Sequence, residues 1–263
     1  LALAVKPRRA LVTAPTFAEY ATALETVGCT VERFTLSEAN DFAVTEEFLD
    51  AIVPGVEIVF LCQPNNPTGQ LASPGLVEKL LRRCEACGAI LAVDECFLDF
   101  LPDADRWTAK PLLESGSLVI FKAFTKLYGM AGVRLGYCLS ADAALLEKMR
   151  NAGQPWAVSS LAQAAGAAAL KETAYVARVR ALIAAQKPKL TAGLRSLGLR
   201  VIEGRANYLL LQGPETLGEQ LRQKGVVLRG CANYPGLDAS WYRTAVRTGP
   251  ELSLIHISEP TRP

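Results

Sequence analysis

The sequence predicts an α/β fold: a mostly parallel sheet sandwiched by helices and followed by a smaller α+β domain. Between residues 8 and 140, short and nearly continuous apolar runs alternate with longer amphipathic stretches. Such runs are typical of strands buried on both faces of a parallel sheet. Residues 141–198 have a helical pattern, and strand-like runs return after Gly198. The return of strands after a long helical stretch indicates the second, smaller domain.

The elements of the first half follow from these patterns in order. Two helices are expected at Phe17–Val27 and Gly75–Cys87, because Gly28 and Gly88 follow them as typical helix-ending glycines. The apolar runs before, between and after them predict five strands, at Arg9–Ala14, Ile58–Cys62, Ile90–Asp94, Leu118–Ala123 and Arg134–Leu139.

The second half begins with helices and ends with strands. An alanine-rich helix is expected at Val158–Leu170, followed by a long amphipathic helix from about Ala174 to Leu197. Further on, we expect the helix Leu217–Lys224 and the strands Arg200–Glu203, Asn207–Gln212, Val226–Arg229 and Tyr242–Arg247. These patterns divide the chain into a large domain at 1–170, a long helix with a small domain at 171–251, and a tail at 252–263.

Composition limits the class of protein. The chain has 263 residues, half of them hydrophobic, and a formal charge of +2, so it can bury a large core and gives no sign of nucleic-acid binding. The sequence contains no run of about 18 apolar residues, so we expect no membrane-spanning helix. The seven cysteines are irregularly spaced, and the lone Cys84-x-x-Cys87 has no second pair to complete a zinc site. We therefore expect no metal, and buried, reduced thiols in a cytoplasmic protein.

Both ends of the sequence have an incomplete pattern. The chain begins at Leu1 without a methionine, so we expect an N-terminal portion to be missing. Residues 252–263 break the preceding pattern and resemble the translation of a sequencing adapter, so we expect them to be non-native. The only histidine is His256, within this tail. A mechanism that needs a histidine base is then excluded for the remaining residues.

Three polar residues follow apolar runs and indicate one cofactor. Asn66 lies in Asn65-Asn66-Pro67-Thr68-Gly69, Asp94 ends another run, and Lys126 follows a third. Taken alone, each has an ordinary explanation: the first is a turn, the second a helix-capping acid and the third a solvated lysine. Together they lie where ligands bind parallel sheets, beyond the carboxyl ends of the strands. They match pyridoxal phosphate, which needs a lysine for its aldehyde, a carboxylate at its ring nitrogen and a donor near its phenolic oxygen. We expect Lys126 to be a partly desolvated, nucleophilic amine.

These motifs resemble the fold-type I pyridoxal-phosphate enzymes of the aminotransferase class I/II superfamily. The resemblance implies that Lys126 bonds the cofactor, Asp94 pairs with the pyridine nitrogen and Asn66 contacts the phenolic oxygen. It also implies that Arg134 reaches the cofactor phosphate and that Phe17 stacks on the ring. Members usually place their sites between two subunits, so it implies a homodimer for the full-length protein.

The second half narrows the substrate to an amino acid with a further anion. Arginine suits two-point binding of carboxylates and phosphates, and Arg229 and Arg243 follow or lie in predicted strands. The segments Arg205–Leu211, Arg229–Leu237 and Gln154–Ser159 resemble the threonine-phosphate decarboxylases of cobalamin biosynthesis, close to the histidinol-phosphate aminotransferases. This resemblance implies that Arg243 takes the substrate carboxylate, that Asn66 also contacts the substrate, and that a buried Arg229 takes the substrate phosphate. An aminotransferase, or an inactive binding protein of the same fold, is the alternative.

Two positions depart from the pattern of related aminotransferases. Phe97 stands where a tyrosine usually donates to the phenolic oxygen, which favours a decarboxylase. Ala123 stands where a phosphate-binding serine or threonine is common, so Thr125 and Arg134 would carry more of that contact. The glycine-rich turn that holds the cofactor phosphate in the family would belong to the missing N-terminal portion.

Overall fold

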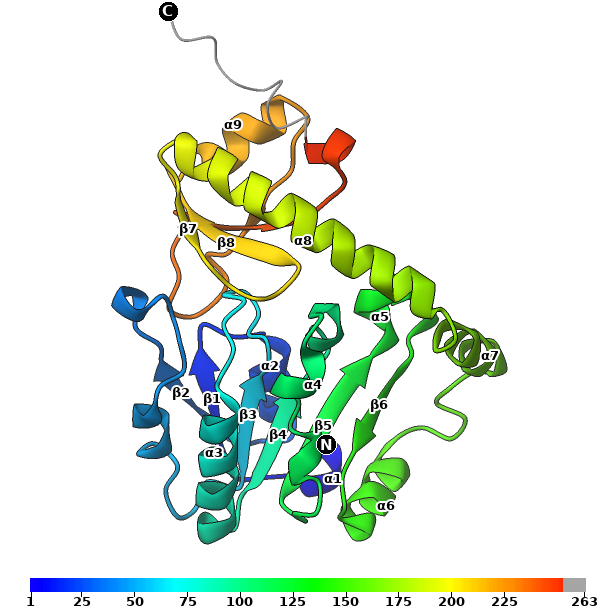
Figure 1. The fold of residues 1–263 in the computed structure, drawn as a ribbon. Coiled ribbons are helices and arrows are strands. Elements are labelled where there is room, and N and C mark those ends of the chain that lie inside the picture. The colour runs from blue at the N-terminus through cyan, green and yellow to red at the C-terminus, as the bar shows by residue number, and fades with distance from the viewer. Residues whose placement is uncertain (253–263) are drawn as a thin grey trace, which may run out of the picture.

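The computed structural model describes residues 1–252, and this part of the chain forms two β-sheets (Figure 1). The larger sheet has six strands in the order β2-β1-β3-β4-β5-β6. Their bounds are β1 Arg9–Ala14, β2 Thr30–Thr35, β3 Ile58–Cys62, β4 Ile90–Asp94, β5 Leu118–Ala123 and β6 Gly136–Leu139. Strands β1 to β5 pair in parallel and β6 pairs antiparallel to β5. The predicted mostly parallel sheet is confirmed.

Two predictions about the large sheet were incomplete. Strand β2 was not expected, because it is an edge strand whose sequence Thr-Val-Glu-Arg-Phe-Thr is partly exposed and has no continuous apolar run. Strand β6 begins at Gly136, not at Arg134 as predicted. Arg134 instead has a left-handed backbone with φ 57°, which ends a short 3-10 helix.

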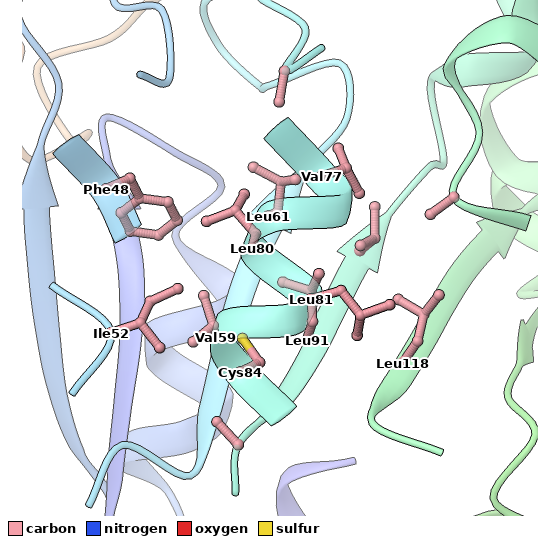
Figure 2. Close-up of a cluster of buried hydrophobic side chains, with 14 of the residues drawn as sticks. Phe48, Ile52, Val59, Leu61, Val77, Leu80, Leu81, Cys84, Leu91 and Leu118 are labelled. Carbon is pink, nitrogen blue, oxygen red and sulfur yellow. The ribbon is translucent and has the colours of Figure 1, made fainter. Parts of the chain in front are cut away.

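Two apolar clusters cover the two faces of this sheet. Helix α3 (Pro74–Cys87) buries one side of its surface, including Leu80 and Cys84, against Val59 and Leu61 of β3 (Figure 2). Ile58 and Phe60, the alternate residues of β3, belong to the cluster on the opposite face, with Tyr20 and Leu24 of helix α2 (Glu19–Glu25). Side chains of a strand alternate between faces, so an unbroken apolar run is what a sheet covered on both sides requires.

The helix boundaries are set by local signals. The Ser73 hydroxyl accepts from the Leu76 N–H at 3.2 Å at the start of α3, and Gly88 ends the helix with φ 70°. Helix α2 is shorter than the predicted Phe17–Val27. The remaining helices are α1 Ala2–Val5, α4 Ala104–Trp107, α5 Phe124–Leu127, α6 Ala143–Ala152, α7 Ser160–Ala169, and the 3-10 helices η1 Glu38–Asn40, η2 Glu46–Leu49, η3 Leu98–Phe100, η4 Lys110–Leu112 and η5 Ala131–Val133.

Helix α8 (Thr173–Ser196) runs from the large sheet to the second sheet, as Figure 1 shows. The second sheet is antiparallel in the order β7-β8-β10-β9, and helix α9 (Leu217–Gln223) follows β8. Its strands are β7 Arg200–Ile202, β8 Tyr208–Gln212, β9 Arg229–Gly230 and β10 Trp241–Ala245. The predicted long helix and the smaller α+β part are confirmed, whereas the division near residue 171 stays a prediction.

The strand predicted at Val226–Arg229 was wrong. Only Arg229 and Gly230 pair with β10, and the Val227 side chain is 73% exposed. Val226 and Leu228 are half-buried and Leu228 packs against the core of the second sheet, but residues 226–228 do not pair with a neighbouring strand of the described chain. Strand β10 also lies slightly earlier than the predicted Tyr242–Arg247. The predicted non-native tail and His256 lie outside the described residues, apart from Leu252, which packs in the core of the second sheet.

All seven cysteines are free thiols, but Cys87, Cys96 and Cys138 are half-buried instead of fully buried as expected. Cys84 lies on the buried side of α3, and burial raises the pKa of its thiol to about 12. Within residues 1–252, none of the helices combines the length and the apolar character needed to cross a bilayer.

The two sheets meet through a close backbone contact. The Arg205 N–H donates to the Gly69 carbonyl at 2.6 Å, and the Tyr208 hydroxyl donates to the Asn65 carbonyl at 2.8 Å. From α8, the Lys187 amine donates to the carbonyls of Gly204 and Ala206. A Cβ added at Gly204 would lie 2.6 Å from the Cα of Gly69, so this approach requires a glycine.

We predict that Gly204→Ala loosens this contact. The added methyl group would meet backbone atoms, which cannot rotate away, so the free energy of unfolding should fall by about 1–3 kcal/mol. Gly116→Ala is the matched control, because a Cβ there meets nothing within 4 Å. Urea unfolding followed by circular dichroism measures both. Equal unfolding midpoints for the two variants would show that the contact is not tight in solution.

Candidate active site

The ends of β3, β4 and β5 bring the predicted cofactor residues together. Asn66 follows β3, Asp94 ends β4 and Lys126 lies in the single turn of α5 after β5. They line one cavity of about 350 Å³, together with three further predicted residues: Phe17, Thr125 and Arg134. Parallel strands end at the same edge, so the three β-strands alone place a lysine, a carboxylate and an amide around one space.

Asp94 is held by two donors. Its Oδ1 accepts from the Cys96 N–H at 2.9 Å, and its Oδ2 accepts from the Tyr20 hydroxyl at 2.5 Å. Tyr20 is buried and stacks on Phe60 with ring centroids 4.7 Å apart. Burial, together with the nearby Cys62 and Asp94, raises the pKa of Tyr20 well above its ordinary value, so the phenol stays a donor.

Sequence reasoning missed Tyr20. Its signal was the spacing in Phe17-Ala-Glu-Tyr20, because residues three apart in the predicted helix Phe17–Val27 would lie on one side. In the structure α2 begins only at Glu19. Here the two rings meet edge to face with centroids 5.5 Å apart. Both residues line the first cavity, and the Tyr20 hydroxyl reaches Asp94 there.

Lys126 and Lys122 differ sharply in their surroundings. Lys122 is buried in β5, and its amine lies 3.1 Å from Glu95 Oε2 and 2.9 Å from Asp99 Oδ1. Glu95 is also fully buried and accepts from the Ala109 N–H at 2.7 Å. Burial acts to lower the pKa of Lys122, but the two carboxylates outweigh it and raise that pKa. Lys122 is therefore a charged structural group, unavailable as a nucleophile.

The Lys126 side chain is exposed, which corrects the expectation of a partly desolvated amine. Its Nζ lies 5.2 Å from the centroid of the Phe97 ring. Position alone explains the exposure: α5 is one turn long, and Lys126 projects where two cavities meet. Residues of this chain alone do not exclude water from the amine.

The second cavity, of about 550 Å³, lies on the side of the antiparallel sheet. Lys126 and Phe97 line both cavities, and Arg229, Arg243, Arg247 and Glu251 line the second one only. The predicted site residues thus fall into two groups that share Lys126. The cofactor candidates line the first cavity, and the arginines predicted to bind the substrate line the second.

Arg243 and Arg229 are held in different ways. Arg243 donates to Asn66 Oδ1 and lies 5.1 Å from the Tyr208 ring centroid, so it is fixed across the junction of the sheets. Arg229 is exposed, which corrects the expectation of a buried guanidinium, because β9 is only two residues long at the sheet edge. Its Nη2 donates to Asn233 Oδ1 at 3.4 Å.

The other candidates are less constrained. Arg134 is exposed and donates to the Ala131 carbonyl at 3.0 Å, Thr125 is half-buried, and Phe17 is 36% exposed. All three side chains line the first cavity. Among the described residues, Asn207 Oδ1 is the buried side-chain oxygen that lacks a hydrogen-bond partner, and Asn207 lines the second cavity. An unpaired acceptor in a cavity wall indicates space for a donor from a ligand.

The aminotransferase class I and II family matches residues 1–254, and the chain belongs to this family. It is 36% identical over 255 residues to the threonine-phosphate decarboxylase of Salmonella typhimurium, covering 95% of this chain and 70% of that protein. The crystal structure of the histidinol-phosphate aminotransferase from Clostridium acetobutylicum superposes with a TM-score of 0.91 at 25% identity, covering 98% of this chain and 78% of that one. The L-threonine-O-3-phosphate decarboxylase of Porphyromonas gingivalis shares the fold, with a TM-score of 0.81 at 23% identity over 98% of this chain and 77% of that one.

We predict that replacing Lys122 destabilises the fold and that replacing Lys126 does not. Lys122→Met would leave Glu95 buried without its cation, so the free energy of unfolding should fall by about 3–5 kcal/mol. Lys126→Met removes an exposed amine and should change it by no more than about 0.5 kcal/mol. Urea denaturation followed by tryptophan fluorescence tests the pair. A stable Lys122→Met protein would mean that the buried network contributes little to folding.

Proposed function

We propose that the protein is a cytoplasmic, pyridoxal-phosphate-dependent enzyme that decarboxylates L-threonine O-3-phosphate to (R)-1-amino-2-propanol O-2-phosphate, a reaction of cobalamin biosynthesis. The observation that carries this proposal is the pair of cavities that meet at Lys126. One is lined by a carboxylate and an amide and the other by arginines. The similarity to the Salmonella typhimurium threonine-phosphate decarboxylase supports the same function.

The donor set of the first cavity fits pyridoxal phosphate. Lys126 supplies the amine for its aldehyde, Asp94 the negative charge for its ring nitrogen, and Asn66 the amide for its phenolic oxygen. Phe17 offers an aromatic face, and Arg134 with Thr125 offers donors for the phosphate. When bound, this cofactor supplies an electron sink for the bond that breaks at the substrate α-carbon. Tyr20 and the Cys96 N–H fix the orientation of the Asp94 carboxylate.

The arginines of the second cavity would orient the substrate. Arg243 would bind its carboxylate, with Asn66 beside it, and Arg229 would bind its phosphate. By fixing both anionic ends, the two arginines would set the orientation of the bonds at the substrate α-carbon. That orientation would decide whether the carboxylate is lost as carbon dioxide or the α-hydrogen is removed for transamination.

A histidinol-phosphate-type aminotransferase is the second candidate. The likeness to the Clostridium acetobutylicum histidinol-phosphate aminotransferase favours it, because both reactions use the same scaffold. Phe97 favours the decarboxylase, since it offers no hydroxyl to the phenolic oxygen. An inactive binding protein is the third candidate, and the presence of Lys126, Asp94 and Asn66 in one cavity argues against it.

We predict that the full-length protein releases carbon dioxide from L-threonine phosphate and exchanges few amino groups with 2-oxoglutarate. Borohydride should fix the cofactor on Lys126, as peptide mapping would show.

The Arg229→Ala variant should discriminate less between threonine phosphate and threonine, by roughly tenfold. This is the lower end of the range for a hydrogen bond to a charged group, because Arg229 is exposed. Arg243→Ala should impair both substrates, since both carry the carboxylate.

Two outcomes would decide against this assignment. Rapid transamination of histidinol phosphate without carbon dioxide release would leave the aminotransferase as the function. Cofactor fixed on Lys122 would contradict the position of the site.

We also propose that the full-length protein is a homodimer. A run of apolar side chains is exposed before and within α7: Trp156 is 95% exposed, Leu161 84% and Val158 38%. Large apolar side chains gathered on one surface are typical of interfaces, and tryptophan is enriched among the residues that dominate binding.

We predict that Trp156→Ser weakens the dimer. Loss of a tryptophan that dominates an interface costs at least about 2 kcal/mol, which is roughly thirtyfold in the dissociation constant. Leu3→Ser is the matched control, because Leu3 lies on α1 and is 59% exposed. Light scattering over a concentration series measures both. A wild-type protein that is active and monomeric at assay concentration would refute the dimer.

A further inference from the structure

A third arginine lines the substrate cavity beside Arg229 and Arg243. Arg247 follows β10, four residues after Arg243, and lines the same cavity of about 550 Å³. Its Nη1 lies 3.5 Å from Glu251 Oε1, and the two side chains are 64% and 50% exposed. The function proposed above uses only two of these three cations.

The negative charge of the proposed substrate is large enough to bind the third arginine, Arg247, as well. A phosphate monoester carries between about −1.5 and −2 charges at pH 7, and the carboxylate adds one more. Arg243 and Arg229 offset only two of these charges. A phosphate group also has three acceptor oxygens, more than one guanidinium fork can satisfy.

We propose that Arg247 binds the substrate phosphate together with Arg229 and thereby selects the dianionic phosphate ester over a monoanionic group of the same shape. This inference rests on the proposed function and adds a specificity-determining residue to it. Arg243, fixed on Asn66 and against Tyr208, remains the partner of the carboxylate.

The contacts of Arg247 allow it to change partners. An exposed ion pair contributes about 0–1 kcal/mol, so exchanging Glu251 for a dianion costs little. Glu251 keeps other partners when Arg247 leaves: its Oε2 accepts from the Thr248 hydroxyl at 2.6 Å and from the Thr248 N–H at 3.1 Å. These hydrogen bonds hold the pKa of Glu251 below its ordinary value, so it stays ionised. Glu251 therefore holds Arg247 near the cavity without blocking it permanently.

The test compares L-threonine O-phosphate with L-threonine O-sulfate, which has a similar shape but one negative charge. In the full-length protein, Arg247→Gln should raise KM for the phosphate roughly tenfold or more and leave KM for the sulfate nearly unchanged. Arg229→Gln should weaken binding of both. Arg222→Gln is the matched control: Arg222 lies on α9, is exposed, pairs with Glu219 at 3.9 Å, and should change neither.

The pH dependence of kcat/KM distinguishes binding of the phosphate by Arg247 from a purely structural role, which would leave it unchanged. In the wild-type protein, kcat/KM for the phosphate ester should rise as the pH passes about 6, where the phosphate loses its second proton. In Arg247→Gln this rise should flatten. An unchanged phosphate-to-sulfate ratio and an unchanged profile would overturn the inference.

Binding without turnover separates this inference from the proposed function. Calorimetry in a Lys126→Ala background measures affinity for both esters with and without Arg247→Gln. If the wild-type protein releases no carbon dioxide but the preference for phosphate depends on Arg247, only the proposed reaction has failed. If it releases carbon dioxide and the preference survives Arg247→Gln, only the role of Arg247 has failed.

Discussion

The contact between the Asn65–Gly69 loop and the segment Gly204–Tyr208 is the constraint on which the candidate site depends. It joins the two sheets at backbone distance, because both Gly69 and Gly204 lack a side chain at the point of approach. The contact sets where β10 lies relative to β3. Asn66 can therefore accept from Arg243, although the two residues are 177 positions apart in the sequence. This contact therefore brings the proposed cofactor residues and the proposed substrate arginines to the same lysine.

A second set of contacts fixes the other side of the site. The buried Lys122, in β5 four residues before Lys126, forms ion pairs with Glu95 and Asp99. Helix α8 docks on the same region, since Arg180 donates to the Asp99 carbonyl at 2.9 Å and Tyr175 donates to the Leu127 carbonyl at 3.0 Å. The short turn that carries Lys126 is thus supported from the buried network below and from the long helix beside it. A rigid support of this kind keeps a reactive side chain in one place while leaving it accessible.

The errors in the predictions have one physical origin. Strand β2 was missed because an edge strand needs no continuous apolar run. The strand at Val226–Arg229 was wrong because an apolar run can pack partly against a core without pairing as a strand. The expected burial of Lys126 and Arg229 was wrong because the exposure of a side chain depends on what packs over it. Tyr20 was missed because its role comes from a hydrogen bond to Asp94, 74 residues away. In each case neighbours distant in sequence decided the outcome.

The sequence by itself determined the class of fold and the three residues at the strand ends. Buried parallel strands require apolar runs, and the edge where they end is the edge where ligands bind, so Asn66, Asp94 and Lys126 could be placed from local pattern alone. Only the tertiary structure decided which lysine is a structural cation, how Asp94 is oriented, and that Arg229, Arg243 and Arg247 line one cavity with Lys126. These features depend on distances between segments far apart in the chain, which packing sets and which no local pattern records.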